Sequence, residues 1–150
     1  MADKLPLASV TTKPLLLVVA VGLIDRPRQK ILLAERPPHK KWAGKWEFPG
    51  GKIEANESPE QALIRECDEE LGVQLSPTDL SPVTFISQDY GDFHLLMPFY
   101  LCWQWHGTAS GREGQEIKWL ALDELPKFPL LEGNLPLLPP LTAFCEKLFR

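Results

Sequence analysis

The sequence is poor in the residues that build disulfide frameworks and zinc sites. It has three cysteines and three histidines in 150 residues, and no two cysteines are spaced as Cys-x-x-Cys. An odd number of distant cysteines argues against a disulfide framework, and scattered histidines argue against a zinc site. Each cysteine lies among apolar neighbours, so we expect reduced thiols in the core at Cys67, Cys102 and Cys145.

A hydrophobic run long enough to cross a bilayer is also missing. The longest apolar stretch, residues 15–24, falls well short of the roughly 20 residues that a membrane-spanning helix needs. The first residues lack the basic start, apolar segment and small-residue cleavage site of a secretory signal. We therefore expect a cytoplasmic protein that makes no contact with a membrane.

No excess of positive charge is present. Sixteen Lys and Arg stand against 20 Asp and Glu, a formal net charge of −4, and the basic residues form no long run. Stable binding of duplex nucleic acid needs a clustered basic surface that neutralises phosphates, so that class is a poor fit. A single small polyanion held through a metal ion stays open. With 44% apolar and 24% charged residues, the composition is that of one globular domain. We expect a flexible tail over residues 1–13 and a single domain over residues 14–150.

Hydrophobic patterning predicts a set of strands. Residues 15–24 favour a buried central strand, and a turn then leads to a second strand over 30–34. Further strand-like segments are 46–48, 83–87, 95–105 and 117–120.

Two helices are expected among these strands. The first begins after Ser58, which forms a capping box with Gln61, and ends where Gly72 suits the left-handed position. The second is expected over residues 141–149. Strands and helices in this order predict an α/β or α+β sandwich.

Three glutamates of the first predicted helix carry the chemistry. Glu66, Glu69 and Glu70 stand at i, i+3 and i+4, which places their carboxylates on one face. Like charges at this spacing destabilise a helix by roughly 0.2–0.5 kcal/mol each, so their presence needs a reason. A carboxylate cluster suits Mg²⁺ or Mn²⁺ when substrate phosphates supply the remaining ligands. The alternative is an exposed acidic face.

The residues around the three glutamates favour the metal site. Gly51, Glu57 and residues 65–73 (RECDEELGV) match Gly-x5-Glu-x7-Arg-Glu-U-x-Glu-Glu-x-Gly-U, where U is apolar. On this pattern the chain resembles the Nudix hydrolases. Its one mild departure is Cys67 at a position that is usually aliphatic, and a buried cysteine behaves as a small hydrophobic residue. The resemblance implies the Nudix fold, a mixed β-sheet sandwiched between helices (α/β/α).

The resemblance also implies an activity and the residues that perform it. In the family, metal-activated water attacks phosphorus in a nucleoside diphosphate linked to another group. The implied Mg²⁺ ligands, with Mn²⁺ as a possible substitute, are Glu66, Glu69, Glu70, the Gly50 carbonyl and, in an assisting role, Glu57. Arg65 would hold Glu66, the candidate general base, although metal-bound hydroxide without a separate base fits the same carboxylates. Lys52 either neutralises phosphate or is merely solvated.

The similarity extends toward the MutT-like 8-oxo-dGTP diphosphatases through residues 46–54 (WEFPGGKIE) and 112–115 (REGQ). In that branch a carboxylate after the late strand serves the metal or the water. Glu113 is the matching residue, Glu116 is its rival, and a solvated loop glutamate is the alternative. The implied reaction converts a nucleoside triphosphate, preferably 8-oxo-dGTP, to the monophosphate and pyrophosphate. Such a reaction belongs to nucleotide-pool sanitation and so to DNA repair.

Three more residues look like the base pocket of that branch. Arg36, Phe48 and Asn134 are alternatively a surface ion pair, a core residue and a turn residue. The amide of Asn134 could donate to guanine O6 and accept from N7, which carries hydrogen only in the 8-oxo base.

Two other functions stay open. CTP or 5-hydroxy-CTP pyrophosphohydrolases share the Trp-Glu-Phe run, and a catalytically silent nucleotide-sensing module is the third candidate. In each case the expected partner is a small nucleotide, bound by a monomer or a dimer.

Overall fold

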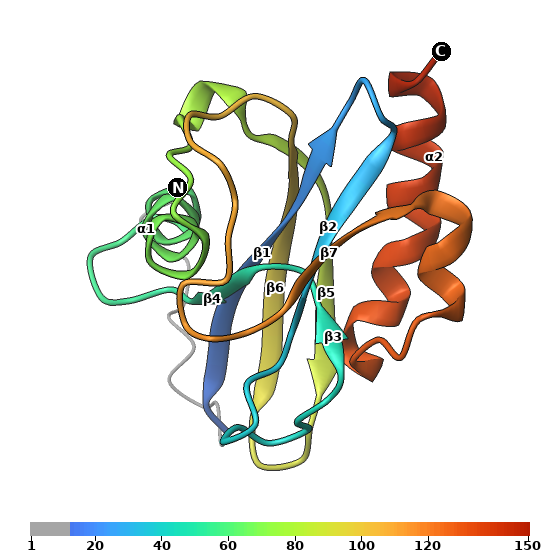
Figure 1. The fold of residues 1–150 in the computed structure, drawn as a ribbon. Helices are drawn as coiled ribbons and strands as arrows, with labels where there is room; N and C mark the ends of the chain where they lie inside the picture. Colours follow the sequence, from blue (N-terminus) through green and yellow to red (C-terminus); the bar gives the residue numbers. More distant parts are fainter. Residues whose placement is uncertain (1–12) are drawn as a thin grey trace, which may run out of the picture.

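The computed structural model describes residues 13–150, where the chain forms a seven-stranded mixed sheet with helices on both sides (Figure 1). The strands are β1 (Leu15–Asp25), β2 (Lys30–Glu35), β3 (Trp46–Glu47), β4 (Gly50–Lys52), β5 (Ser81–Asp89), β6 (His94–Cys102) and β7 (Ile117–Ala121). The helices are α1 (Pro59–Leu71) and α2 (Leu138–Leu148), with short 3₁₀ turns η2 (Pro77–Asp79), η3 (Leu122–Lys127) and η4 (Glu132–Leu137). Residues 1–12 of the expected tail lie outside the described residues, so the division into tail and domain stays a prediction.

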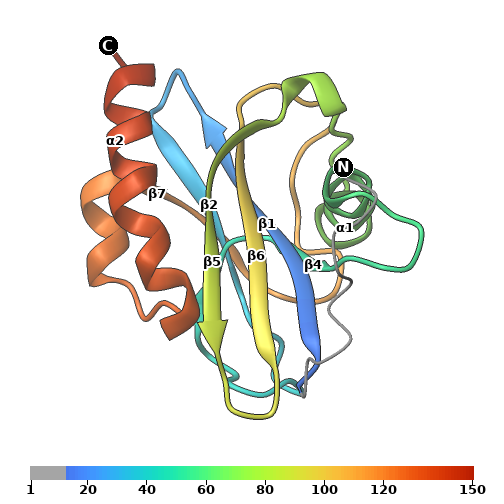
Figure 2. The same cartoon turned by 180° about the vertical axis from the view of Figure 1, so that it is seen from behind.

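β1 is the centre of the sheet. The strand order is β3-β2-β1-β6-β5, with β4 also pairing with β1 and β7 with β2. β1 and β6 run parallel, whereas the other pairs are antiparallel. α1 and α2 flank the sheet on opposite sides, as Figure 2 shows from behind. The predicted α/β/α sandwich is therefore confirmed.

Each face of the sheet has its own hydrophobic core. Val19, Val21 and Leu23 of β1 pack on the α1 side, and Ala20 and Ile24 pack on the α2 side. This alternation follows from the two-residue period of a strand. The expectation of a buried strand is correct for the second half of β1. In the first half Leu15 is 55% exposed and Leu17 is 39% exposed.

The predicted boundaries of α1 are confirmed. Ser58 Oγ accepts a hydrogen bond from Gln61 N (3.1 Å), and Gln61 Oε1 accepts one from Ser58 N (2.8 Å). Gly72 closes the helix in the left-handed conformation, with φ of 72°. Leu63, Cys67 and Leu71, which recur every four residues along this helix, are fully buried and form its core-facing side.

The boundaries of three other elements were predicted wrongly, and the first is β5, which covers Ser81–Asp89 instead of 83–87. α2 starts at Leu138 instead of residue 141, because Pro139 and Pro140 fit the first helical turn, where a backbone N–H has no partner. β6 ends at Cys102 instead of residue 105, because the chain then leaves the sheet and His106 pairs with Gln74.

The expectations for the cysteines and the hydrophobic segments can also be compared with the structure. Cys67, Cys102 and Cys145 are buried and free, as expected. Burial raises the pKa of each of their thiols. Over residues 13–150, no helix is long and apolar enough to cross a membrane.

Candidate active site

A cavity of about 530 Å³ opens beside β1 and β4 and reaches α1 on one side and η4 on the other. Its walls include residues that the sequence assigned to metal binding and residues that it assigned to the substrate. These are Gly50, Glu66 and Glu70 together with Arg36, Phe48, Lys52 and Asn134. The two ends of the expected site therefore share one cavity.

Two glycines bring the backbone of β4 close to its neighbours. A Cβ at Gly50 would lie 1.9 Å from the carbonyl oxygen of Val19, and one at Gly51 would lie 2.5 Å from Cδ of Glu66. The neighbouring backbone therefore excludes a side chain at Gly50, and a side chain at Gly51 would displace the carboxylate of Glu66. The carboxylate of Glu66 rests directly on the glycine backbone and faces the cavity.

Arg65 divides its guanidinium group between two glutamates. Nε and Nη2 donate to the two oxygens of Glu57 (2.8 and 3.0 Å), and Nη1 donates to Oε1 of Glu66 (2.7 Å). The Arg65 hydrogen bonds and the backbone N–H of Glu54 lower the pKa of Glu57 to about 2. Glu57 is thus engaged by Arg65 and does not line the cavity, while Oε2 of Glu66 is left without Arg65.

Glu70 lies at the centre of a carboxylate cluster. Burial raises the pKa of its carboxyl group well above the usual range, and the neighbouring groups of Glu66, Glu113 and Glu47 raise it further. Glu47, which sequence reasoning missed, lines the cavity between the two ends of the site. The sequence feature that could have indicated Glu47 is its place between two aromatic residues, Trp46 and Phe48, which are both buried.

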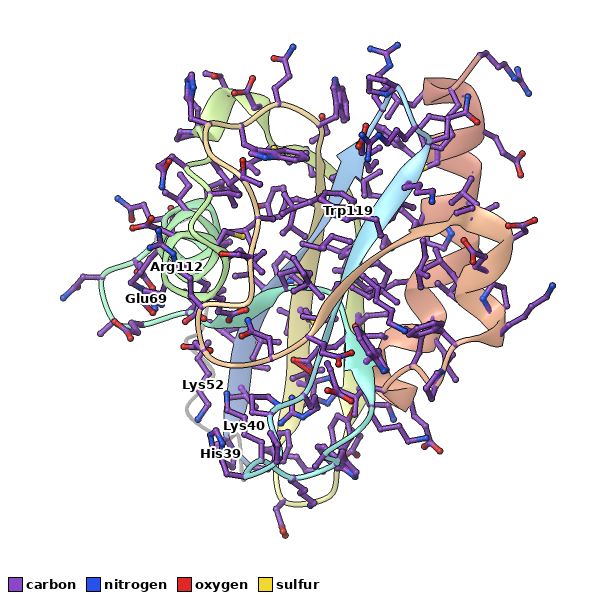
Figure 3. All side chains as sticks on the ribbon, in the orientation of Figure 1. His39, Lys40, Lys52, Glu69, Arg112 and Trp119 are labelled. Atoms are coloured by element: carbon purple, nitrogen blue, oxygen red, sulfur yellow. The ribbon has the colours of Figure 1, made fainter. Side chains whose placement is uncertain are left out.

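The third helix glutamate, Glu69, does not join this cluster. Its side chain is 55% exposed, lies 3.6 Å from Arg65 and is absent from the cavity wall. Figure 3 shows it beside α1. Within residues 13–150, no three His, Cys, Asp or Glu side chains are grouped so as to hold a metal ion by themselves. In this structure Glu66 and Glu70 therefore line the cavity and Glu69 does not, and the assignment of all three as metal ligands stays a prediction.

The donors at this end of the cavity still suit a divalent cation. Carboxylate and carbonyl oxygens are hard ligands of the kind that Mg²⁺ and Mn²⁺ prefer. Glu66 and Glu70 lie close together, and Arg65 pairs with Glu66 through Oε1 while Glu70 has no such cation among the ion pairs of the described residues, so a bound cation would relieve their repulsion. Such a site needs further ligands, which substrate phosphates can supply.

Glu113 and Glu116 sit in the loop before β7, outside the cavity wall. Glu113 is exposed, yet it lies near enough to Glu70 to raise the pKa of that carboxyl group. The backbone of Glu116 accepts a hydrogen bond from Glu35 N (2.9 Å). Lys52 and Lys40, both labelled in Figure 3, are exposed residues of the cavity wall.

At the other end of the cavity Asn134 is buried, with 7% of its surface exposed. Its Oδ1 accepts a hydrogen bond from the backbone N–H of Phe48 (3.1 Å), which fixes the orientation of the amide. The backbone N–H of Asn134 donates to the carbonyl of Leu131 (2.9 Å), which agrees with the alternative that Asn134 is a turn residue. Phe48 is also a core residue, since its ring lies 5.1 Å from that of Phe99. Both residues line the cavity and also have the structural roles that the sequence left open as alternatives.

Arg36 likewise combines both interpretations. Its Nη1 forms an ion pair with Oε2 of Glu47 (2.7 Å), and its Nε donates to the carbonyl of Lys41 (2.8 Å), yet the side chain lines the cavity. The loop that it anchors carries Trp42, which is 49% exposed and has a φ of 61°. Tyr90 and Phe93, whose rings stack at 5.2 Å, complete this aromatic rim and had no sequence signal beyond being aromatic.

Comparison with known proteins gives a consistent result. The protein family described as "NUDIX domain" matches this chain over residues 15–141. The 8-oxo-dGTP diphosphatase of Escherichia coli is 39% identical over 71% of this chain and 81% of its own length. The CTP pyrophosphohydrolase of the same organism is 35% identical over 80% of this chain and 87% of its own.

Solved structures agree in fold. The E. coli ORF135 protein is 34% identical with a TM-score of 0.78, covering 93% of this chain and 94% of that one. MutT, in a study of the Aliivibrio salmonicida and Vibrio cholerae proteins, is 31% identical with a TM-score of 0.73, covering 90% and 97%. With a glutamate-lined cavity on this fold and these relatives, the chain belongs to the Nudix family and is a MutT-like Nudix pyrophosphohydrolase of nucleoside triphosphates.

Proposed function

We propose that this enzyme converts 8-oxo-dGTP, as its preferred nucleoside triphosphate, to the monophosphate and pyrophosphate with Mg²⁺. The observation that carries the proposal is the single cavity that joins the carboxylates of Glu66 and Glu70 to the oriented amide of Asn134. The 39% identity to an 8-oxo-dGTP diphosphatase supports it. Such an activity removes an oxidised nucleotide before it is incorporated, which is nucleotide-pool sanitation. We place it in the cytoplasm, in a monomer or a dimer.

Glu66, Glu70 and the carbonyl of Gly50 would hold the cation. Glu113 lies near Glu70 and would assist, whereas Glu57 and Glu69 would join only after their side chains leave their present positions near Arg65. When bound, Mg²⁺ screens the phosphate charge and makes water a better nucleophile. Lys52 and Lys40 at the cavity mouth would attract the triphosphate.

Glu66 is the proposed general base. Arg65 holds Oε1 through a hydrogen bond of 2.7 Å, so Oε2 can accept the proton of the attacking water. Arg65 is itself fixed by its two hydrogen bonds to Glu57 and by donation to the carbonyl of Lys52 (3.1 Å). The residues of the Nudix box thereby orient the base before substrate binds.

Asn134 would read the base. One lone pair of Oδ1 takes the Phe48 N–H, so the second can accept from N7–H of 8-oxoguanine while Nδ2 donates to O6. Ordinary guanine has an unprotonated N7, which sets two acceptors against each other. A mismatch of this kind costs about 1–3 kcal/mol.

A CTP or 5-hydroxy-CTP pyrophosphohydrolase is the second candidate. The relative of that activity is 35% identical and covers 80% of this chain, more than the 8-oxo-dGTP diphosphatase covers. The same amide can donate to N3 of cytosine and accept from its N4 amine. The carboxylate end of the cavity would be unchanged.

The test is pyrophosphate release with Mg²⁺ across 8-oxo-dGTP, dGTP, CTP, 5-hydroxy-CTP and ADP-ribose, compared as kcat/KM. A large preference for 8-oxo-dGTP over dGTP supports the proposal. A preference for the cytosine nucleotides would show that the preferred base is cytosine instead of 8-oxoguanine, and the proposed metal site would be unaffected. The variants Glu66→Gln and Glu70→Gln should each lower kcat by orders of magnitude, and unchanged kcat in both would contradict the metal site.

A further inference from the structure

Gln115 uses both ends of its side-chain amide in the loop that carries Glu113. Its Nε2 donates to the backbone carbonyl of Glu70 (3.1 Å), and its Oε1 accepts from the backbone N–H of Glu113 (2.9 Å). One side chain therefore connects the backbones of Glu70 and Glu113, and the charge of Glu113 is near enough to raise the pKa of Glu70. These two hydrogen bonds account for the position of the Gln115 side chain.

This loop is attached to the end of α1 and has little regular structure of its own. The N–H groups of Ser110 and Arg112 donate to the carbonyls of Leu71 and Glu70, each at 3.0 Å. The last carbonyls of a helix have no helical partner, so they are available to these donors. Gly114 turns the next part of the loop with φ of 81°, and nothing lies within 4 Å of where its Cβ would be.

We propose that Gln115 is a positioning residue for catalysis, which holds Glu113 against Glu70 and so completes the carboxylate cluster. The inference rests on the proposed function, because it gives Glu113 a part in cation binding. Like-charged carboxylates separate unless their backbones are tied. A neutral amide ties them by donating and accepting at once, without adding charge to the cluster.

Alternative residues cannot reproduce this bridge. A carboxylate at position 115 lacks the donor for the Glu70 carbonyl, and an ammonium group lacks the acceptor for the Glu113 N–H. A methionine has nearly the length of glutamine but makes neither strong hydrogen bond. Gln115→Met therefore removes the bridge while keeping most of the side-chain volume.

The test measures Mn²⁺ binding by titration of the metal-free full-length chain, together with kcat and KM. Outer residues that orient metal ligands typically contribute about 10-fold to 100-fold to metal affinity, so Gln115→Met should weaken Mn²⁺ binding by that factor. We expect kcat to fall with KM little changed, and the Glu113 amide of the metal-free protein to exchange hydrogen faster. Gln104→Met, at an exposed glutamine after β6, is the matched control and should leave all four readouts unchanged.

A Glu113→Gln variant and the double variant separate the possible outcomes. If Gln115 acts through Glu113, Gln115→Met should weaken Mn²⁺ binding little further when Glu113→Gln is already present. Additive losses, or wild-type binding by Gln115→Met, would overturn the inference. Wild-type behaviour of Glu113→Gln would overturn it too, yet the proposed metal site would stand as long as Glu70→Gln still abolishes binding. Should Gln115→Met fold poorly, Gln115→Ala in the same cycle replaces it.

Discussion

Arg65 is the residue whose shape matters most at the cavity. It spans Glu57 and Glu66 with three hydrogen bonds of 2.7–3.0 Å, and a planar guanidinium fork is required to reach all of the acceptor atoms. Its side chain is 25% exposed, so these contacts lie partly out of water. The charge alone would not fix the orientation of Glu66.

We therefore expect Arg65→Lys to lower kcat by about 100-fold, because a displaced catalytic group typically costs that much. The change in KM should be smaller, and the far-ultraviolet spectrum should stay that of the wild type. Steady-state kinetics with the preferred nucleotide provide the measurement. Arg28→Lys, at an exposed arginine 3.7 Å from Asp25, is the control. Equal kcat values for Arg65→Lys and the wild type would contradict the role given to Arg65.

Asn134 allows a prediction about specificity instead of rate. Asn134→Ala should reduce the ratio of kcat/KM for 8-oxo-dGTP to that for dGTP by about 10-fold to 100-fold, since one or two hydrogen bonds to the base are lost. The variant should also be less stable, because the Phe48 N–H loses its partner. Asn134→Asp keeps the acceptor and removes the donor, so it tests which half of the amide discriminates. A ratio that persists in both variants would show that other residues read the base.

Among the elements, α1 shows how local sequence signals specify a boundary. Its C-terminus combines two constraints on Gly72: the φ of 72° and the guanidinium group of Arg112, which a Cβ would approach to 2.5 Å at Nε. Arg112 also brings positive charge to a helix end whose last turn has none of its own.

Gly72→Ala should therefore destabilise the protein by more than the roughly 1–2 kcal/mol that the left-handed conformation costs an L-residue. Gly91→Ala is a matched control, because Gly91 has φ of 87° and nothing within 4 Å of its would-be Cβ. Urea unfolding of both variants isolates the clash with Arg112 as the difference in their free energies of unfolding. Adding Arg112→Ala should restore part of the loss in Gly72→Ala. Equal losses for the two glycine variants would show that Arg112 moves aside without cost.

The elements also show what the sequence could and could not predict. α1, with its capping box and terminal glycine, was predictable because its signals lie within a few residues of one another. The hydrogen bond between Phe48 and Asn134 joins residues 86 positions apart, so no local pattern could reveal it. Glu69 is exposed and pairs with Arg65 at 3.6 Å instead of lining the cavity, which the spacing of the three glutamates alone does not reveal. The end of β6 depends on a bridge to Gln74, another distant contact.

At the scale of the whole molecule, the fold brings Glu66 and Glu70 together beside the cavity, and their mutual repulsion lowers the stability of the protein. β1 buries its second half between two hydrophobic cores, while its first half, at Leu16 and Val18, forms a wall of the cavity. Glu66 and Glu70 thus stand at the edge of the well-packed region. The charged form of these carboxylates lowers the stability of the metal-free protein and is also the form that binds a cation, so both properties should depend on pH.

The metal-free protein should be most stable in mildly acidic solution. The pKa of Glu57 is lowered to about 2 by Arg65, so its contribution is present above about pH 4.5 and is lost as the pH falls toward 2. The pKa of Glu70 is raised by burial and by Glu66, so its contribution is full below about pH 4.5 and is lost as the pH rises. The two signs are opposite, and stability should decline on both sides of this range.

Thermal unfolding from about pH 3 to about pH 8, in chelator and in Mg²⁺, tests this balance. In chelator the Tm should fall between mildly acidic and mildly alkaline solution, and Mg²⁺ should restore it, since a cation that binds only the folded state stabilises that state. Glu70→Gln should remove both the alkaline decline and the response to Mg²⁺. Glu69→Gln, whose side chain is 55% exposed and outside the cavity, should change the decline far less. If the alkaline decline survives in Glu70→Gln, the buried cluster is not its origin, and if the response to Mg²⁺ survives, the cation binds to a site other than the one around Glu70.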